Sequence, residues 1–405
     1  MSVANLQGRV DELVEQSSQE LAQHRRHLHR HPELSNREQN TAAYLIDQLR
    51  RIGVDEIRSG LAGHGVIAVI RGQRLSTEQP DRIIALRADM DGLPVREATG
   101  LEYASTITTT DDEGATVPVA HACGHDCHMA VVLMAARILT SVRAELPGTV
   151  LCVFQPAEEG PPLNEEGGAQ ALIDSGAFDG IKPTMVFGMH VSPLPRGFVG
   201  YRAGAQFAAS TRVELTFEGV PTHAAMPWLG KDPLLAAAST LVAAQGLTRH
   251  IPATQPATVT FGHLEDRGRY NTIGGVARLH GTIRCSDDSD MDLLKSRLGA
   301  VAEGQATSHG CTARVRFVQD VPALINHQSW IDAAMPTLRR ALPDGHLVDA
   351  PQTLGYDDVS ALVRRFGGLY LLYGVQDTQA APGKPGTFEA VSGGRGLVPN
   401  PCVSG

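Results

Sequence analysis

The residues with the clearest chemical potential lie in the segment 121–128, which reads HACGHDCH. A thiolate and an imidazole two positions apart, as at Cys123 and His125, suit a borderline-soft divalent metal ion. Asp126 is a candidate to orient the His125 ring through its second nitrogen. A single cysteine or histidine at the start of a helix is more often a cap or core residue, but the density of ligand types in this segment favours a metal site.

A pair of adjacent carboxylates, Glu158 and Glu159, follows the apolar run 149–154. Such a run is typical of a strand buried on both faces, and ligands of open α/β sheets bind beyond the carboxyl ends of the strands. One carboxylate of the pair can bind a metal ion while its neighbour accepts a proton from water. A solvated acidic turn is the alternative interpretation of the pair taken alone.

Two further predicted strands also end in polar residues. His190 closes the run 184–190, and Asp89 and Asp91 follow the run 82–87 at alternate positions. Alternate residues of an extended segment lie on one face, so both acids point the same way. If these strands share the sheet edge with the glutamate pair, His190 becomes a candidate metal ligand.

Other potentially chemical patterns are weaker. His27 and His31 are spaced four residues apart on a predicted helix, but this helix precedes the first strand, which favours a structural or solvated face. The chain contains no phosphate-binding glycine loop and no Gly-x-Ser-x-Gly elbow. Nucleotide chemistry and serine-hydrolase chemistry therefore have no support in the sequence.

The elements around these motifs alternate between strand and helix, which predicts an α/β domain with buried strands. Two helices are expected in residues 3–52, with a break at 31–33 and with Asn36 as the cap of the second helix. The alternation resumes after Pro322. We therefore predict one discontinuous α/β catalytic domain, with helices on both faces of its sheet, formed by residues 1–205 and 320–405.

The pattern between these two parts differs. Residues 212–217 alternate polar and apolar side chains, as expected for a sheet covered on one face only. Asp232 followed by Pro233 predicts an N-cap and the first position of an alanine-rich helix. Strands near 257–265 and 276–285 complete an α+β unit, so residues 206–319 are predicted to form an inserted domain.

Composition excludes several classes of protein. The 405 residues are 42% hydrophobic and 20% charged, as in an ordinary folded protein. The net charge of −9 and the aromatic content of 5% argue against nucleic-acid binding. The N-terminal residues have no signal-peptide pattern, and no apolar stretch is long enough to span a membrane. In a reducing compartment, six cysteines in 405 residues are not expected to form a disulfide framework. We expect a cytoplasmic protein with no membrane or nucleic-acid partner.

Taken together, the motifs resemble those of the metal-dependent aminoacylase and carboxypeptidase family. The match is to its amidohydrolase branch, which includes hippurate hydrolases, indoleacetyl-amino-acid hydrolases and N-acetyldiaminopimelate deacetylases. The resemblance extends from His27 to about Gly374. It is carried by five motifs, which are LRADMDGLP at 86–94, HACGHD at 121–126, QPAEEG at 155–160, GMH at 188–190 and GVPTHAAMP at 219–227.

The resemblance implies a site for two divalent metal ions per chain, zinc or manganese. The metal ligands that it implies are Cys123, His125, Glu159 and His190. It gives Glu158 the role of general base, which deprotonates water and later protonates the leaving amine. Asp91 matches an acid near the metals that supports a ligand.

The resemblance also gives the inserted domain two roles, as a lid and as the interface of a homodimer. His223 corresponds to a histidine that reaches the partner subunit's site and stabilises the tetrahedral oxyanion. Asn271 and Arg284 match positions associated with the substrate carboxylate, which a guanidinium can bind through two parallel hydrogen bonds.

The chain departs from the family near its C-terminus. Family members place a further metal-binding histidine shortly before a Thr-x-x-Phe-type segment, but residues 381–388 read APGKPGTF and no histidine follows His346. We therefore expect one of the two metal ions to bind weakly.

The function that these motifs imply is metal-dependent hydrolysis of the amide bond of a small N-acyl amino acid, which yields a carboxylic acid and a free amino acid. Two alternatives remain open at this point. One is a dipeptidase or carboxypeptidase of the same family. The other is a metal-depleted, catalytically silent amide-binding protein.

Overall fold

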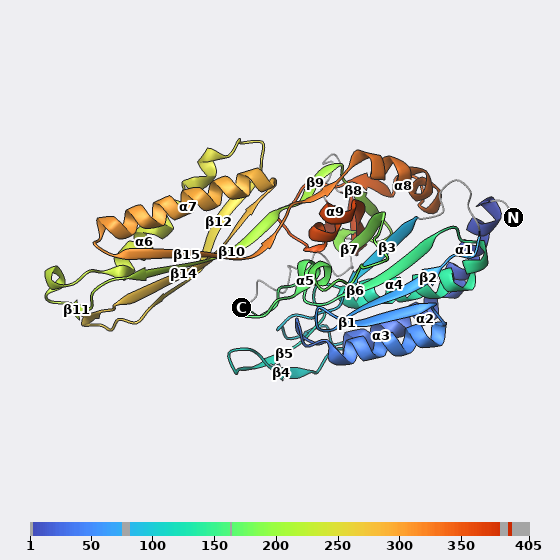
Figure 1. The fold of residues 1–405 in the computed structure, drawn as a ribbon, viewed down its shortest axis with the longest axis horizontal. Helices are drawn as coiled ribbons and strands as arrows, with labels where there is room; N and C mark the ends of the chain where they lie inside the picture. The colour runs from blue at the N-terminus through green and yellow to red at the C-terminus, as the bar shows by residue number, and fades with distance from the viewer. Residues whose placement is uncertain (1–2, 75–81, 163, 381–387, 391–405) are drawn as a thin grey trace. The chain divides into compact units, whose positions relative to one another are not determined.

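The computed structural model describes residues 3–74, 82–162, 164–380 and 388–390, and the chain divides into two compact units (Figure 1). Unit 1 contains Met1–Gly204, Asn326–Pro351 and Ala361–Gly405, and unit 2 contains Ala205–Ile325 and Gln352–Ser360. The short segment 352–360 belongs to unit 2 through backbone hydrogen bonds. In these, Thr353 N–H donates to the Gln206 carbonyl at 3.1 Å, and Ala208 N–H donates to the Gly355 carbonyl at 2.8 Å.

Unit 1 is built on a mixed eight-stranded sheet. Its strands in spatial order are β1 (Glu56–Leu61), β2 (Gly65–Arg71), β6 (Thr149–Gln155), β3 (Ile83–Asp89), β7 (Met185–Pro195), β18 (Gly368–Gln376), β8 (Val199–Tyr201) and β17 (Leu347–Asp349). The central strands β6, β3, β7 and β18 run parallel to one another. Their carboxyl ends therefore lie along the same edge of the sheet.

Helices cover both faces of this sheet, which confirms the predicted α/β class (Figure 1). They are α1 (Val3–Gln16), α2 (Ser18–Arg30), α3 (Gln39–Ile52), α4 (His125–Ser141), α5 (Gly168–Asp174), α8 (Gln328–Ala341) and α9 (Val359–Phe366). Leu86, Cys152 and Phe154 point toward α3 and α4 and form one core with them. Each such side chain that is fully buried stabilises the fold by about 1.5–3 kcal/mol.

The N-terminal region differs from its prediction in two respects. Residues 3–52 form three helices, because the first predicted helix is interrupted at Ser17, whose hydroxyl donates to the Leu13 carbonyl at 2.6 Å. Asn36 does not cap α3, because its backbone takes a left-handed φ of 60° outside the helix. The Glu33 carboxylate accepts the N–H groups of Asn40 and Thr41 instead, at 3.1 and 2.8 Å.

Unit 2 is an antiparallel sheet packed against two helices (Figure 1). Its strands in spatial order are β12 (Ala257–Asp266), β14 (Val276–Cys285), β10 (Ala209–Glu218) and β15 (Thr312–Val321), and its helices are α6 (Pro233–Ala244) and α7 (Asp288–Ser308). The Asp232 side chain accepts the Leu235 N–H at 3.1 Å, which confirms the predicted cap of α6. The one-sided core contains Val213, Leu215 and Phe217 of the alternating strand β10.

Shorter elements complete the described chain. They are β4 (Thr108–Thr110), β5 (Thr116–Pro118), β9 (Gly204–Phe207), β11 (Thr222–His223), β13 (Thr272–Ile273), β16 (Leu324–Asn326), β19 (Thr378–Ala380), β20 (Phe388–Ala390) and the 3-10 turns η1 (Arg143–Glu145), η2 (Pro227–Leu229) and η3 (Leu247–His250). Within the described residues, no helix has the length and hydropathy of a bilayer-spanning segment.

Candidate metal centre

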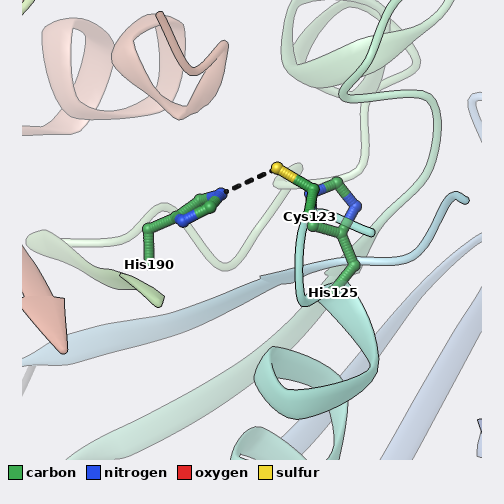
Figure 2. Close-up of side chains that lie close together, drawn as sticks. All are labelled: Cys123, His125 and His190. Atoms are coloured by element: carbon green, nitrogen blue, oxygen red, sulfur yellow. Dashed lines mark hydrogen bonds between the residues drawn. The ribbon is translucent and has the colours of Figure 1, made fainter. Parts of the chain in front are cut away.

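The candidate site lies where β3 and β6 of unit 1 end, next to the middle of β7. Asp91 follows β3, and the glutamate pair follows β6. His190 does not close its strand as predicted but lies in the middle of β7, which continues to Pro195. Among the described residues, three groups of potential ligand atoms that lie within 4.8 Å of one another share His125, and one of them is Asp89, His125 and His128. The other two groups contain the predicted ligands. One group is Cys123, His125 and His190, shown in Figure 2, and the other is His125, Glu158 and Glu159.

A glycine allows the loop before α4 to approach β7. Gly124 has a backbone φ of 91°, a conformation that side chains rarely adopt, and an added Cβ would lie 2.3 Å from the Val191 Cγ2 atom. This close approach places the Cys123 Sγ atom 3.4 Å from the His190 Nε2 atom (Figure 2). The glycine of the HACGH motif is therefore required for the site to assemble.

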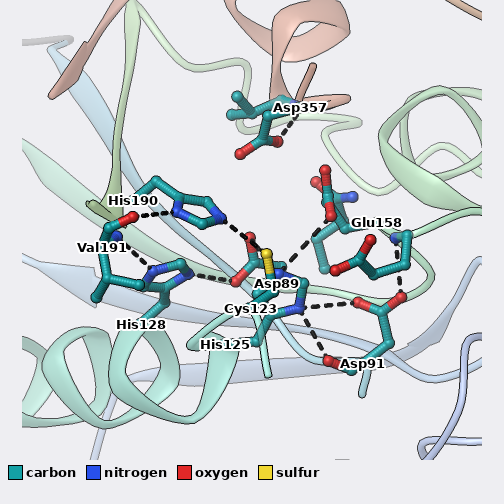
Figure 3. A network of polar contacts seen from close by, with 12 residues as sticks. Asp89, Asp91, Cys123, His125, His128, Glu158, His190, Val191 and Asp357 are labelled. Atoms are coloured by element: carbon teal, nitrogen blue, oxygen red, sulfur yellow. Dashed lines mark hydrogen bonds and ion pairs between the residues drawn. The ribbon is translucent and has the colours of Figure 1, made fainter. Parts of the chain in front are cut away.

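Hydrogen bonds fix the orientation of both imidazoles. The His190 Nδ1 atom donates to the Val191 carbonyl at 2.6 Å. The His125 Nδ1 atom donates to the Asp91 carbonyl at 2.9 Å and lies 3.2 Å from the Asp91 Oδ1 atom (Figure 3). These partners leave the Nε2 atom of each ring to face the centre, as is usual for metal-binding histidines.

The donor set fits a divalent metal ion. His125 is fully buried, and its Nε2 atom makes no hydrogen bond within the described part of the chain. The carboxylate oxygens of Asp89 and Glu158 lie 3.6 and 3.7 Å from this nitrogen. A buried imidazole nitrogen that makes no hydrogen bond, beside a thiol and carboxylates, matches the ligand chemistry of zinc-type ions.

Burial and neighbouring charges raise the pKa values of three ionisable groups of the centre. Burial raises the pKa of the Cys123 thiol to about 12. Burial alone would lower the pKa of His125, but Asp89 and Asp91 outweigh it and raise that pKa well above its usual value. Burial and the charge of Asp91 also raise the pKa of Glu159. Metal ligands bind in their deprotonated form, so the affinity for metal should weaken as the pH falls.

One residue beside the centre, His128, was not among the predicted site residues, and it contacts Asp89, one of the two acids that the sequence analysis singles out. The Asp89 carboxylate accepts hydrogen bonds from the His128 Nδ1 atom and the Arg87 Nη1 atom, both at 2.6 Å. The His128 Nε2 atom in turn accepts the Val191 N–H at 3.0 Å (Figure 3). This buried network links α4, β3 and the backbone next to His190. The available signal was the spacing of His128, one helical turn after His125.

The hypothesis that Asp126 orients His125 was wrong. The Asp126 carboxylate accepts hydrogen bonds from the Arg25 Nε atom at 2.7 Å and the His29 Nδ1 atom at 2.8 Å, both of which lie on α2. Consecutive residues of a helix point about 100° apart, so Asp126 cannot share the direction of His125. Asp91 orients the His125 ring instead.

The three candidate residues of unit 2 are not all close together. His223 lies in the small β11–β13 ribbon, and Asn271 directly precedes β13, where its carbonyl accepts the Ala224 N–H at 2.9 Å. The His223 side chain is exposed, and its Nδ1 atom accepts the Ala225 N–H at 3.1 Å. Arg284 lies near the opposite end of β14, eight residues beyond Val276, which spans roughly 27 Å of extended strand.

Arg284 has local partners in unit 2. Its Nη1 atom donates to the Leu354 carbonyl at 2.9 Å, and its guanidinium carbon lies 4.9 Å from the centre of the Tyr356 ring. These contacts hold the side chain at the end of β14.

Replacing Cys123 with alanine should release metal, because it removes a direct ligand. Loss of a group that only orients a ligand weakens metal affinity about 10- to 100-fold, so the loss of a ligand itself should exceed this range. Elemental analysis after gel filtration measures the effect, with Cys127→Ala as a matched control. Cys127 is a neighbouring thiol that belongs to no group of converging ligands among the described residues. Unchanged metal content in Cys123→Ala would exclude this thiol as a ligand.

Comparison with known proteins identifies the family of this chain. The family model for "Peptidase family M20/M25/M40" matches residues 85–384. The chain is 36% identical to an N-acetyldiaminopimelate deacetylase of Oceanobacillus iheyensis, over 77% of this chain and 79% of the relative. It is 31% identical to an N-acetylcysteine deacetylase of Bacillus subtilis, over 88% of both chains.

A solved structure is also similar. It is that of a Bacillus subtilis protein described as a dinuclear metal-binding peptidase of the M20 family, with a TM-score of 0.69, 29% identity and coverage of 92% of both chains. These matches confirm the family resemblance that the motifs indicate. With the family model matching most of its length and its candidate ligands converging at one sheet edge, the chain belongs to peptidase family M20/M25/M40.

Proposed function

We propose that this enzyme is a metal-dependent amidohydrolase that cleaves N-acyl amino acids into a carboxylic acid and a free amino acid. The observation that carries the proposal is the placement of two adjacent glutamates beside the Cys123 thiol and the His190 imidazole, around the buried His125. The similarity to two deacetylases of N-acetylated amino acids supports the substrate class.

In this proposal, the residues of unit 1 have distinct roles. Cys123, His125, Glu159 and His190 would hold divalent metal ions, which lower the pKa of water and polarise a carbonyl. Glu158 is the general base, and its Oε2 atom lies 3.7 Å from the His125 Nε2 atom. It takes a proton from the attacking water and returns it to the leaving amine. Asp91 keeps His125 in the orientation that ligation needs.

The residues of unit 2 support the proposal of a homodimer. His223 and Arg284 lie near opposite ends of this compact unit, and this separation supports an active site that takes the two residues from different subunits. We propose that His223 and Asn271 serve the site of the partner subunit, where His223 stabilises the oxyanion. Exposed apolar side chains along η2 and α6 are suited to an interface, and they include Trp228 at 74% exposure and Val242 at 71%.

The cellular compartment is part of the same proposal. The five cysteines of the described residues are all free thiols. Free thiols are typical of proteins in a reducing compartment, which supports a location in the cytoplasm.

The proposed activity can be tested with a panel of N-acetyl amino acids, with amine release as the readout. We expect hydrolysis that a chelator abolishes and that zinc or manganese restores. Unblocked dipeptides serve as the comparison panel. Preference for dipeptides would indicate a peptidase, and no turnover of either panel by metal-loaded protein would indicate a silent amide-binding protein.

The absence of a histidine after His346 leads to a prediction about metal content. A site with one ligand fewer should hold one of its two ions weakly. Purified protein should then contain about one tightly bound ion per chain, and its activity should rise on addition of zinc or manganese. Elemental analysis before and after dialysis measures this.

An added histidine provides the complementary experiment. Lys384→His or Pro385→His introduces an imidazole near Thr387, at positions that lie outside the described residues. Higher metal occupancy in either variant would support the missing-ligand explanation. Two tightly held ions in the unmodified protein would contradict it and indicate a substitute ligand.

A further inference from the structure

The loop that carries the glutamate pair has an unusual backbone. Ala157, which directly precedes Glu158, has a φ of 55°. This left-handed conformation is uncommon for alanine because its Cβ atom crowds the next carbonyl oxygen. Such residues persist where the surrounding structure holds them, and they are frequent at functional sites. The conformation of Ala157 determines the direction in which the chain presents Glu158.

Two buried carboxyl groups hold the backbone on either side of Glu158. The Glu38 Oε1 atom accepts the Ala157 N–H at 2.8 Å, and the Asp91 Oδ2 atom accepts the Glu159 N–H at 3.0 Å. Glu38 and Asp91 are 0% and 1% exposed. Asp91 already has a role at His125, but nothing in the site described above uses Glu38.

The buried environment of Glu38 is unfavourable for a carboxyl group, which indicates that the side chain does more than pack. Burial, together with the nearby charge of Asp91, raises the pKa of Glu38 to about 8. Its Oε2 atom is buried and makes no hydrogen bond among the described residues. A buried carboxyl without a cationic partner destabilises a fold relative to an apolar side chain of similar size. The contact that sets Glu38 apart is its hydrogen bond to the glutamate loop.

The turn that carries Glu38 also forms hydrogen bonds with the other end of the loop that contains the glutamate pair. The Asn36 Nδ2 atom donates to the Glu166 carbonyl at 2.9 Å and to the Glu165 Oε2 atom at 3.0 Å. Asn36 itself has a left-handed φ of 60°. The segment 36–38 therefore holds residue 157 on one side of the glutamate pair and residues 165–166 on the other.

We propose that Glu38 is a positioning residue that accepts the Ala157 amide proton and so fixes the turn that aims Glu158 and Glu159 at the metal centre. This inference rests on the proposed roles of the two glutamates. The competing explanation is that Glu38 only stabilises the start of α3.

Glu33 provides a matched control for that competing explanation. It lies on the same turn, and its carboxylate accepts the N–H groups of Asn40 and Thr41 at the start of α3. It makes no described side-chain hydrogen bond to the glutamate loop. Glu33→Gln should therefore lower the melting temperature while kcat stays within about twofold of wild type, since capping affects stability.

The test compares Glu38→Leu, Glu38→Gln and Glu38→Asp with wild type and Glu33→Gln. Leucine removes the acceptor, and aspartate is one methylene too short to reach the Ala157 amide. Both variants should lower kcat about 10- to 100-fold with little change in KM, as expected for a misaligned catalytic group. Glutamine retains an oxygen acceptor of the right length, so kcat should stay within a few-fold of wild type.

Hydrogen–deuterium exchange of the peptide around residues 155–160 provides a readout that does not depend on activity. Exchange should be faster in Glu38→Leu and Glu38→Asp but not in Glu38→Gln or Glu33→Gln. If Glu38→Leu does not fold, the comparison of kcat between Glu38→Gln and Glu38→Asp decides. A higher kcat in Glu38→Asp than in Glu38→Gln overturns the proposal. Unchanged exchange in Glu38→Asp also overturns it. If wild type hydrolyses no N-acyl amino acid, the proposed function fails, while the exchange pattern still tests the contact.

Discussion

Replacing Glu158 with glutamine should lower kcat for amide hydrolysis by about two to four orders of magnitude, the usual contribution of a general base. Glutamine has nearly the shape of glutamate but cannot accept a proton from water. Because Glu158 is proposed as the base and Glu159 as the ligand, metal content in Glu158→Gln should stay close to wild type. Steady-state kinetics and elemental analysis of the same preparation measure both quantities.

The neighbouring glutamate is the matched control for this experiment. Glu159→Gln should lose metal as well as activity, and added zinc or manganese should restore part of both. The contrast is informative because the two glutamates share one loop and both belong to the group that includes His125. Near wild-type turnover in Glu158→Gln would exclude it as the base, and metal loss in Glu158→Gln alone would reverse the two roles.

The convergence of the main candidates was predictable because it follows from strand direction. The apolar runs that lead to Asp89, Glu158 and His190 indicated buried parallel strands, and the carboxyl ends of parallel strands meet at one edge of the sheet. The observed order of β6, β3 and β7 places them there. The α/β class and the capping of α6 by Asp232 likewise follow from local pattern.

The partners of these candidates were not predictable, because they depend on contacts between distant segments. Nothing in the spacing of Asp126 indicates that its carboxylate binds Arg25, about a hundred residues earlier. The hydrogen bond between Glu38 and Ala157 joins residues 119 positions apart. Asn36 has the side chain of a helix cap, yet tertiary contacts hold it in a left-handed turn instead. Local propensity does not determine such choices when burial favours another geometry.

The proposed role of His223 across subunits leads to the second large effect. His223→Ala and Glu158→Gln should each be nearly inactive, since loss of an oxyanion donor costs about 100- to 1,000-fold in kcat. Mixing the two variants and allowing subunits to exchange should restore activity to about a quarter of wild type. Half of the dimers are then mixed, and each mixed dimer has one site with both residues intact.

The mixing experiment distinguishes clearly between action of His223 across subunits and action within its own chain. If His223 acts within its own chain, no mixed dimer contains a complete site, and activity stays at the level of the single variants. Subunit exchange must be demonstrated independently, for example by native mass spectrometry of differently labelled variants. Mixing His223→Ala with Arg284→Ala tests whether the two ends of unit 2 serve one site from different subunits. Arg284 lies roughly 27 Å along β14 from the ribbon of His223, so recovery is expected only if the two residues serve one site from different subunits.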